Sequence, residues 1–92
     1  MNTKLLLTLE LLPQECGGDY KFSSAVYMTR GFINALQDDA GNIVVHSLRL
    51  IHSQCVGDSD GADYIQVFKC GDIRFWCIDD ISHITFLLPE EY

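Results

Sequence analysis

ADYIQVFKCGDIRFWCIDD, residues Ala62–Asp80, is the most regular pattern in this sequence and contains its only tryptophan. Two apolar runs, Tyr64–Phe68 and Ile73–Ile78, flank a glycine at position 71. A three-residue hairpin loop needs its last residue in the left-handed backbone region, which glycine adopts without a Cβ penalty. The pattern therefore predicts a β-hairpin that turns at Lys69-Cys70-Gly71.

This loop length fixes the predicted register of the hairpin. Side chains alternate strictly across a strand, so one face becomes entirely apolar and is expected to be the core face. Its residues are Ile65, Val67, Ile73 and Phe75. The opposite face is expected to hold Tyr64, Gln66, Arg74 and Trp76. On that face Tyr64 lies across from Trp76. A two-residue turn at Cys70-Gly71 is the alternative, and it would mix apolar and polar side chains on both faces.

The length and composition of the chain are those of one globular domain. It has 92 residues, of which 48% are hydrophobic, so residues 1–92 are expected to form a single domain. Asp and Glu number 13 against 6 Lys and Arg, which gives a net charge of −7. Direct binding to nucleic-acid phosphates needs clustered basic residues. The charge therefore favours a basic partner, or solubility alone.

The use of cysteine is typical of a reducing compartment. The four cysteines are Cys16, Cys55, Cys70 and Cys77. They form no Cys-x-x-Cys motif, and no secretory signal precedes them. The apolar run at residues 5–12 is shorter than the roughly 20 residues that span a bilayer. The sequence therefore predicts a cytoplasmic protein with reduced thiols and no membrane contact, with two disulfides as the alternative.

The N-terminal half of the chain is read from its periodicity. Thr3–Leu12 alternates like a strand, with a Leu-rich helix as the alternative. Lys21–Thr29 is a second strand candidate because it is rich in β-forming residues. Gly31–Gln37 is expected to form a short helix with Thr29 as its cap. Residues 38–42 read as a turn, and residues 14–19 and 56–62 as loops.

The main helix is expected after the turn at 38–42. Four apolar residues between positions 44 and 55 recur with helical spacing, whereas the β-branched run at 43–45 leaves a strand as the rival. Ser82–Leu88 alternates as a strand that is antiparallel to Ile73–Ile78. Together the segments predict an α+β fold, an antiparallel sheet of about five strands with one main helix packed on one face.

No residue pattern predicts catalysis, a metal or a cofactor. The carboxylates of the loop before the hairpin lack the glycine and glutamate positions of a calcium loop. His52-x-x-Cys55 has helical ligand spacing, but the second pair typical of structural zinc is absent. Cys77, Asp79 and His83 are residue types that nucleophilic catalysis uses, and no catalytic motif accompanies them. We therefore expect a protein that is not an enzyme and binds no cofactor.

The aromatic pair of the hairpin is the strongest candidate for a binding site. If its face meets solvent, Tyr64 and Trp76 form an anchor with an acidic rim, and interface hot spots favour Trp and Tyr. If the helix covers that face, both rings belong to the core. The candidate partner-binding residues are Arg30, Asp38, Asp39, Asp58, Asp60, Asp63, Tyr64 and Trp76.

Three blocks of the sequence resemble a family of small uncharacterised bacterial domains carried on plasmids and other mobile elements. The blocks are Val26–Gly31 (VYMTRG), Gly71–Asp79 (GDIRFWCID) and Ile84–Tyr92 (ITFLLPEEY). Cys77 stands where that family usually has a lysine, and the acidic stretch before the hairpin is shorter here. The resemblance brings no established activity with it, and it implies a mobile-element setting.

In that setting, small acidic proteins without enzymatic activity look like anti-defence proteins. The leading hypothesis is an anti-CRISPR inhibitor that binds a surveillance complex and blocks target DNA binding by occupying a basic nucleic-acid-binding surface. Arg30 would contact an acidic partner residue or a nucleic-acid backbone such as the guide RNA. The alternatives are an antirestriction DNA mimic, a small zinc or redox regulator, and a structural subunit.

Overall fold

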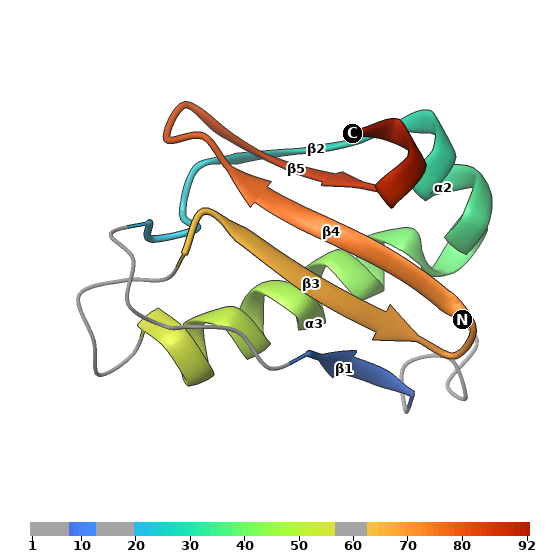
Figure 1. The fold of residues 1–92 in the computed structure, drawn as a ribbon, viewed down its shortest axis with the longest axis horizontal. Coiled ribbons are helices and arrows are strands. Elements are labelled where there is room, and N and C mark those ends of the chain that lie inside the picture. The colour runs from blue at the N-terminus through green and yellow to red at the C-terminus, as the bar shows by residue number, and fades with distance from the viewer. Residues whose placement is uncertain (1–7, 13–19, 57–62) are drawn as a thin grey trace.

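A computed structural model describes residues 8–12, 20–56 and 63–92, and within them five strands form one sheet (Figure 1). The strands are β1 (Leu9–Leu11), β2 (Ala25–Met28), β3 (Ile65–Cys70), β4 (Ile73–Asp79) and β5 (His83–Leu87). Their order in the sheet is β1-β3-β4-β5-β2. The α+β class is thereby confirmed. The predicted strands at 3–12 and 21–29 are shorter than expected where the structure describes them, and residues 1–7, 13–19 and 57–62 lie outside the described part.

One pairing differs from the predicted antiparallel sheet. β3, β4 and β5 form an antiparallel meander, and β1 pairs antiparallel with β3. β2, however, pairs in parallel with β5. This direction brings the ends of β2 and β5 together, where the Thr29 N–H donates to the Phe86 carbonyl at 3.0 Å. The expectation of a wholly antiparallel sheet was therefore wrong for β2.

The helices run consecutively after β2. They are α2 (Arg30–Leu36), the 3₁₀ turn η1 (Gln37–Asp39), α3 (Ala40–Ile51) and the π-turn η2 (His52–Val56). The Thr29 hydroxyl accepts from the Phe32 N–H at 3.2 Å, which confirms Thr29 as the cap of α2. The predicted turn at 38–42 is wrong, because α3 already begins at Ala40. No helix of the described ranges is long and apolar enough to cross a membrane.

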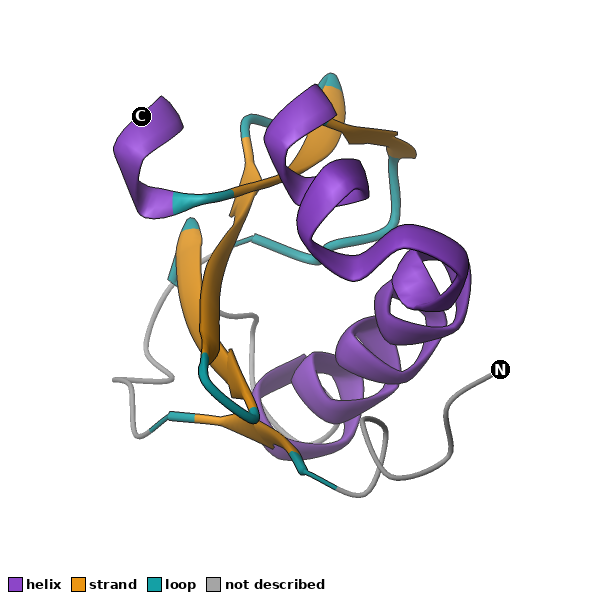
Figure 2. Cartoon of the chain, turned by 90° about the vertical axis from the view of Figure 1, so that its right-hand side faces the viewer, coloured by secondary structure: helices purple, strands orange, loops and turns teal. Residues whose placement is uncertain are grey.

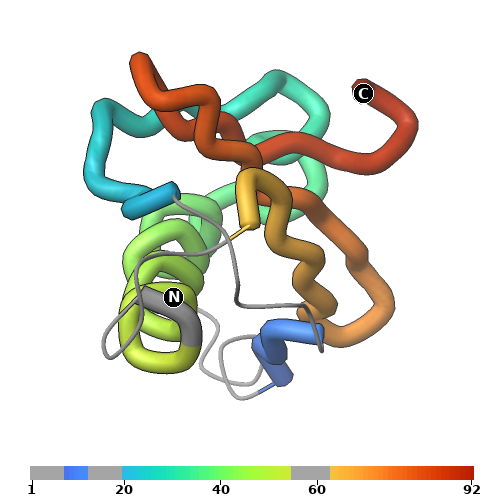
Figure 3. The backbone as a smooth tube through the Cα atoms, turned by 60° about the vertical axis from the view of Figure 1, so that its left-hand side comes forward, coloured from blue at the N-terminus to red at the C-terminus, as the bar shows by residue number. Residues whose placement is uncertain are grey.

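The helical segment lies on one face of the sheet, which we call the inner face (Figure 2). Figure 3 follows the chain from β2 through α2 into α3 along this face. The 3₁₀ turn η3 (Pro89–Glu91) lies on the opposite side of the sheet from α3. We call that opposite side the outer face. α3 is a helix, as the apolar spacing predicted, and not the alternative strand. One face of this helix is buried, and it holds Ile43, Val44, Ser47 and Ile51, which recur with helical spacing.

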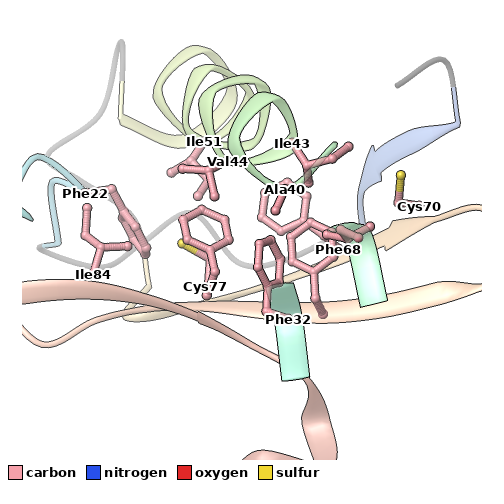
Figure 4. Packing of buried hydrophobic residues seen from close by; sticks show 13 residues of the cluster. Phe22, Phe32, Ala40, Ile43, Val44, Ile51, Phe68, Cys70, Cys77 and Ile84 are labelled. Carbon is pink, nitrogen blue, oxygen red and sulfur yellow. The ribbon is translucent and has the colours of Figure 1, made fainter. Parts of the chain in front are cut away.

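The core fills the space between α3 and the inner face (Figure 4). Five phenylalanines are each at most 1% exposed: Phe22, Phe32, Phe68, Phe75 and Phe86. The rings of Phe68 and Phe75 stack at 5.1 Å, and Phe32 meets Phe75 edge-on at 5.1 Å. Such contacts between neighbouring rings stabilise a core beyond the area that they bury.

The hairpin of β3 and β4 turns at two residues, Gly71-Asp72, and not at three. Cys70 pairs with Ile73 and Phe68 with Phe75, so the predicted register was wrong. Gly71 has a φ of 60°, as the first central residue of a type II′ hairpin turn requires. The strands are therefore longer than predicted, and every pairing shifts.

This shift changes which residues of the hairpin are buried. Phe75 is in the core as predicted, and Ile73 packs against the core while partly buried. Ile65 and Val67, predicted to be core, pair with Ile78 and Trp76 on the outer face. Gln66, predicted to face outward, is fully buried. Apolar residues occupy both faces of this hairpin, so alternation alone did not select the inner one.

Candidate functional site

The outer face of the central strands carries apolar side chains, although no helix of the described residues covers it. Val67 pairs with Trp76 and Ile65 with Ile78, and these four side chains are only partly buried. In Figure 2 the two main helices lie on the other side of the sheet, and among the described helical segments η3 alone lies toward the outer face. An uncovered apolar face of this kind is typical of an interaction surface.

Four aromatic side chains gather on and beside this face, and we call them the aromatic cluster. They are Tyr20, Tyr64, Trp76 and Tyr92. The rings of Trp76 and Tyr92 meet edge-on with centroids 5.2 Å apart, and those of Tyr20 and Tyr64 lie 6.1 Å apart. The Tyr64 side chain lies close enough to Tyr92 for Tyr92 to raise the pKa of Tyr64. Tyr64 and Trp76 are thus not cross-strand partners, as was predicted, but are linked through Tyr92.

The cluster is partly exposed and carries polar hydroxyl groups. Tyr64 is 41% exposed and Tyr92 is 72% exposed. Charge repulsion from Tyr92, followed by partial desolvation, raises the pKa of Tyr64 above its ordinary value. The Tyr64 phenol therefore stays protonated at neutral pH and offers a hydrogen-bonding group at the edge of an apolar surface.

Glu91 fixes the position of the last turn and hence of Tyr92. Its carboxylate accepts from the Thr29 hydroxyl at 2.5 Å, from the Leu88 N–H at 2.9 Å and from the Gly31 N–H at 3.1 Å. The hydrogen bond from Thr29, followed by that from Leu88, lowers the pKa of Glu91. A negative charge at the beginning of α2 also complements the helix dipole.

The Gly31 backbone lies unusually close to this carboxylate. A Cβ at position 31 would lie 2.6 Å from the Glu91 Cδ and Oε2 atoms. Gly31 therefore permits the approach of the C-terminal turn to α2. Two of the blocks quoted from the sequence, at 26–31 and 84–92, meet at this contact.

Asp79 organises the other end of the sheet. This residue is 4% exposed, and its carboxylate accepts from the Phe22 N–H at 2.9 Å and from the Ile81 N–H at 2.8 Å. Both donors belong to residues with positive φ, 52° at Phe22 and 81° at Ile81. Buried polar groups of this kind need hydrogen-bond partners. The Asp79 carboxylate has two, and through them it binds the loop that contains Phe22 and the turn that contains Ile81 to the end of β4.

Charges border the aromatic cluster at both ends. Asp63 directly precedes Tyr64, and its carboxylate accepts from the Tyr64 N–H at 2.9 Å. At the far end of the hairpin, Lys69 pairs with Arg74 across the strands, with Glu10 beside Lys69. Within the described ranges, neither of these two basic side chains forms an ion pair. The acidic residues Asp58 and Asp60 of the predicted rim lie outside the described residues.

Three predicted contact residues lie away from Asp63 and Tyr64 at the start of β3, although Arg30 lies between Thr29 and Gly31, which contact Glu91 next to Tyr92. Arg30 begins α2, and Asp38 and Asp39 lie in η1. In Figure 1 these helical segments lie at the opposite end of the molecule from the start of β3. Asp39 is 8% exposed, which does not fit a surface contact. The structure therefore brings together Asp63, Tyr64 and Trp76, but does not place Arg30, Asp38 or Asp39 beside them.

The thiols and imidazoles do not converge in the described part of the chain. Cys70 and Cys77 are both buried, and burial raises the pKa of Cys77 well above its ordinary value. Cys77 points inward, whereas the alternation of β5 places His83 on the outer face. Across residues 8–12, 20–56 and 63–92, no three His, Cys, Asp or Glu side chains are grouped to hold a metal ion.

Sequence reasoning missed Tyr20, Tyr92, Asp79, Ile81 and Glu91 as parts of this surface or its support. The contacts of Asp79 with Phe22 and of Glu91 with Thr29 join residues 57 and 62 positions apart, so no local pattern indicates them. No protein-family model, curated protein or solved structure matches this chain.

Proposed function

We propose that this protein is an anti-defence inhibitor that acts by binding and not by catalysis. Its partner is the basic nucleic-acid-binding surface of a CRISPR surveillance complex in the cytoplasm of a bacterial host, where it blocks target DNA binding. The observation that carries the proposal is the partly exposed cluster of Tyr64, Trp76 and Tyr92 on a sheet face that no helix covers.

The charge of the chain supports a basic partner. Acidic residues outnumber basic ones by 13 to 6. The Asp63 carboxylate accepts from the Tyr64 N–H, and the Asp80 carboxylate accepts from the His83 N–H at the β4–β5 turn. Complementary charge mainly speeds the association of two proteins. The acidic surface would therefore steer the chain toward Lys and Arg residues that otherwise hold phosphates.

The aromatic cluster supplies the contacts that slow dissociation. Trp and Tyr bury a large area at a small cost in side-chain entropy, and they dominate interface hot spots. The contact of Trp76 with Tyr92 and the anchoring of η3 by Glu91 hold the rings in place before binding. Pre-organisation of this kind reduces the entropy lost on binding.

Lys69 and Arg74 favour a second candidate, a platform for single-stranded nucleic acid. Open sheets bind single strands by stacking bases on aromatic rings beside basic side chains. Here two basic residues flank a face with Trp76 and Tyr92. The net charge of −7 opposes it. Tight binding of a labelled single-stranded oligonucleotide by the protein alone would favour this candidate over the inhibitor.

The proposal is tested by mobility shift of target DNA. A purified type I surveillance complex is incubated with equimolar protein before labelled double-stranded target is added. We expect the shifted complex to disappear with the wild type and to remain with Trp76→Ala. Val45→Ala, an exposed site on α3, serves as the control that still inhibits. Normal DNA binding in saturating wild-type protein would refute the proposal for this complex.

A further inference from the structure

The two tight turns of the meander use different residues at the same position. In the β3–β4 turn the first central residue is Gly71, with a φ of 60°. In the β4–β5 turn, Ile81-Ser82 follows Asp80, whose N–H donates to the His83 carbonyl at 3.0 Å. Its first central residue is Ile81, with a φ of 81°. Ile81 thus occupies the position that glycine holds in such turns.

A β-branched residue is costly in this conformation. Positive φ brings the Cβ too close to the backbone carbonyl, and β-branched residues with positive φ are genuine outliers. Packing does not offset the cost, because Ile81 is 75% exposed, more than any other large apolar residue in the described part of the chain. Fold stability alone therefore gives no reason for isoleucine at this position.

The surrounding structure nevertheless holds Ile81 firmly. The buried carboxylate of Asp79 accepts from its N–H at 2.8 Å. The Ser24 hydroxyl donates to its carbonyl at 2.7 Å. These hydrogen bonds keep the Ile81 backbone in an unfavourable conformation. Backbone strain that the surrounding structure maintains in this way is typical of functional sites.

We propose that Ile81 is a presented apolar anchor that inserts into an apolar pocket, bordered by basic residues, on a protein partner. This inference rests on the proposed function and adds a second contact point to the aromatic cluster. The turn adjoins that cluster, because the Asp79 N–H donates to the Tyr64 carbonyl at 2.9 Å.

The charge beside the anchor defines the border of the partner's pocket. Asp80, directly before Ile81, accepts from the His83 N–H and the Ser82 hydroxyl, each at 2.9 Å. The hydrogen bond from the His83 N–H, followed by that from Ser82, lowers the pKa of Asp80. Its carboxylate is therefore charged at neutral pH and favours Lys or Arg next to the pocket. Lys21 and Ile81 line the same hollow.

The first test measures stability. Ile81→Gly and Ile81→Asn both suit a positive φ and both remove the apolar side chain. We expect each to raise the melting temperature, by about 4–8 °C where the strain is fully relieved. A lower melting temperature for both variants would show that Ile81 stabilises the fold, and would overturn the proposal.

The second test measures capture of the partner. Tagged wild type, Ile81→Asn and the control Val45→Asn are used as baits in lysate of a bacterium that carries a type I CRISPR system. We expect a protein that Val45→Asn retains at the wild-type level and Ile81→Asn retains at less than a tenth of it. Absence of any protein with this dependence on Ile81 would overturn the anchor.

The two proposals fail in different ways. If an Ile81-dependent partner is captured but is not a nucleic-acid-binding complex, the anchor stands and the proposed function fails. If the wild type and Ile81→Asn block target DNA binding by the surveillance complex equally well, the proposed function stands and the anchor fails.

Discussion

Substitution of Asp79 by Asn tests the support beneath the proposed surface. The side chain is 4% exposed and binds the N–H groups of Phe22 and Ile81 at 2.9 and 2.8 Å. Asn keeps one acceptor oxygen and places an amide NH₂ where the second oxygen was. One backbone N–H is then left facing another donor in a buried site.

The expected loss follows from these two contacts. A hydrogen bond to a charged group contributes about 1.5–3 kcal/mol, and a buried donor without a partner costs about 1–3 kcal/mol. We expect Asp79→Asn to lower the free energy of unfolding by about 2–3 kcal/mol in total. For a domain of this size that corresponds to a fall in melting temperature of about 8–24 °C.

Urea denaturation followed by the fluorescence of Trp76 measures this loss. The midpoint should fall while the slope stays unchanged, because the same surface is exposed on unfolding. Asp72→Asn, an exposed residue in the first hairpin turn, is the matched control and should change stability by less than about 0.5 kcal/mol. A similarly small change for Asp79→Asn would refute the role of its carboxylate.

Two further predictions concern the contact between the C-terminal turn and α2. Gly31→Ala should stabilise the protein more in a Glu91→Ala background than in the wild type, because the added Cβ would lie 2.6 Å from the Glu91 carboxylate. Thermal melts of the four proteins measure this coupling, and an equal effect in both backgrounds would contradict the contact. Hydrogen bonds, first that from Thr29, lower the pKa of Glu91 in the folded protein below its ordinary value of 4.5. The ionised Glu91 therefore stabilises the fold fully above pH 4.5, and this stabilisation is lost as the pH falls through the lower pKa of the folded state. Over this acidic range the melting temperature of Glu91→Gln should therefore fall less steeply than that of the wild type. The difference should be small, because the Glu91 carboxylate is exposed. Identical melting-temperature profiles of the two proteins would argue against this role of Glu91.

Local patterns predicted the elements whose signals lie within a few residues. The cap at Thr29 and the strand at His83–Leu87 follow from capping chemistry and alternation, and both are confirmed. The helix at Ala40–Ile51 was favoured over a strand for its apolar spacing, and is also confirmed. Its starting residue was missed because Asp38 to Asn42 has the composition of a turn.

The hairpin register failed for a physical reason. Glycine with positive φ suits the last residue of a three-residue loop and also the first central residue of a type II′ turn. Ile65, Val67 and Trp76 are apolar and yet face outward, while Gln66 faces inward. The usual assignment of the apolar face to the core therefore selected the wrong register, because the outer face is itself apolar.

The candidate site was predicted only in part. The sequence indicated Asp63, Tyr64 and Trp76, and the structure places them at one surface. Tyr92 and Ile81 join that surface through contacts across the fold, and Glu91 and Asp79 hold them in place. The Thr29–Glu91 and Phe22–Asp79 contacts join residues 62 and 57 positions apart and leave no periodic signal, whereas the contact of Asp79 with Ile81 is local.

The most direct test of the proposed function is the affinity of a purified type I surveillance complex for the wild type and for Trp76→Ala. Removal of a hot-spot tryptophan costs about 2 kcal/mol or more, which is a factor of about 30 in Kd. We therefore expect Kd to rise at least about 30-fold. An unchanged Kd would contradict the claim that the uncovered sheet face is the binding surface.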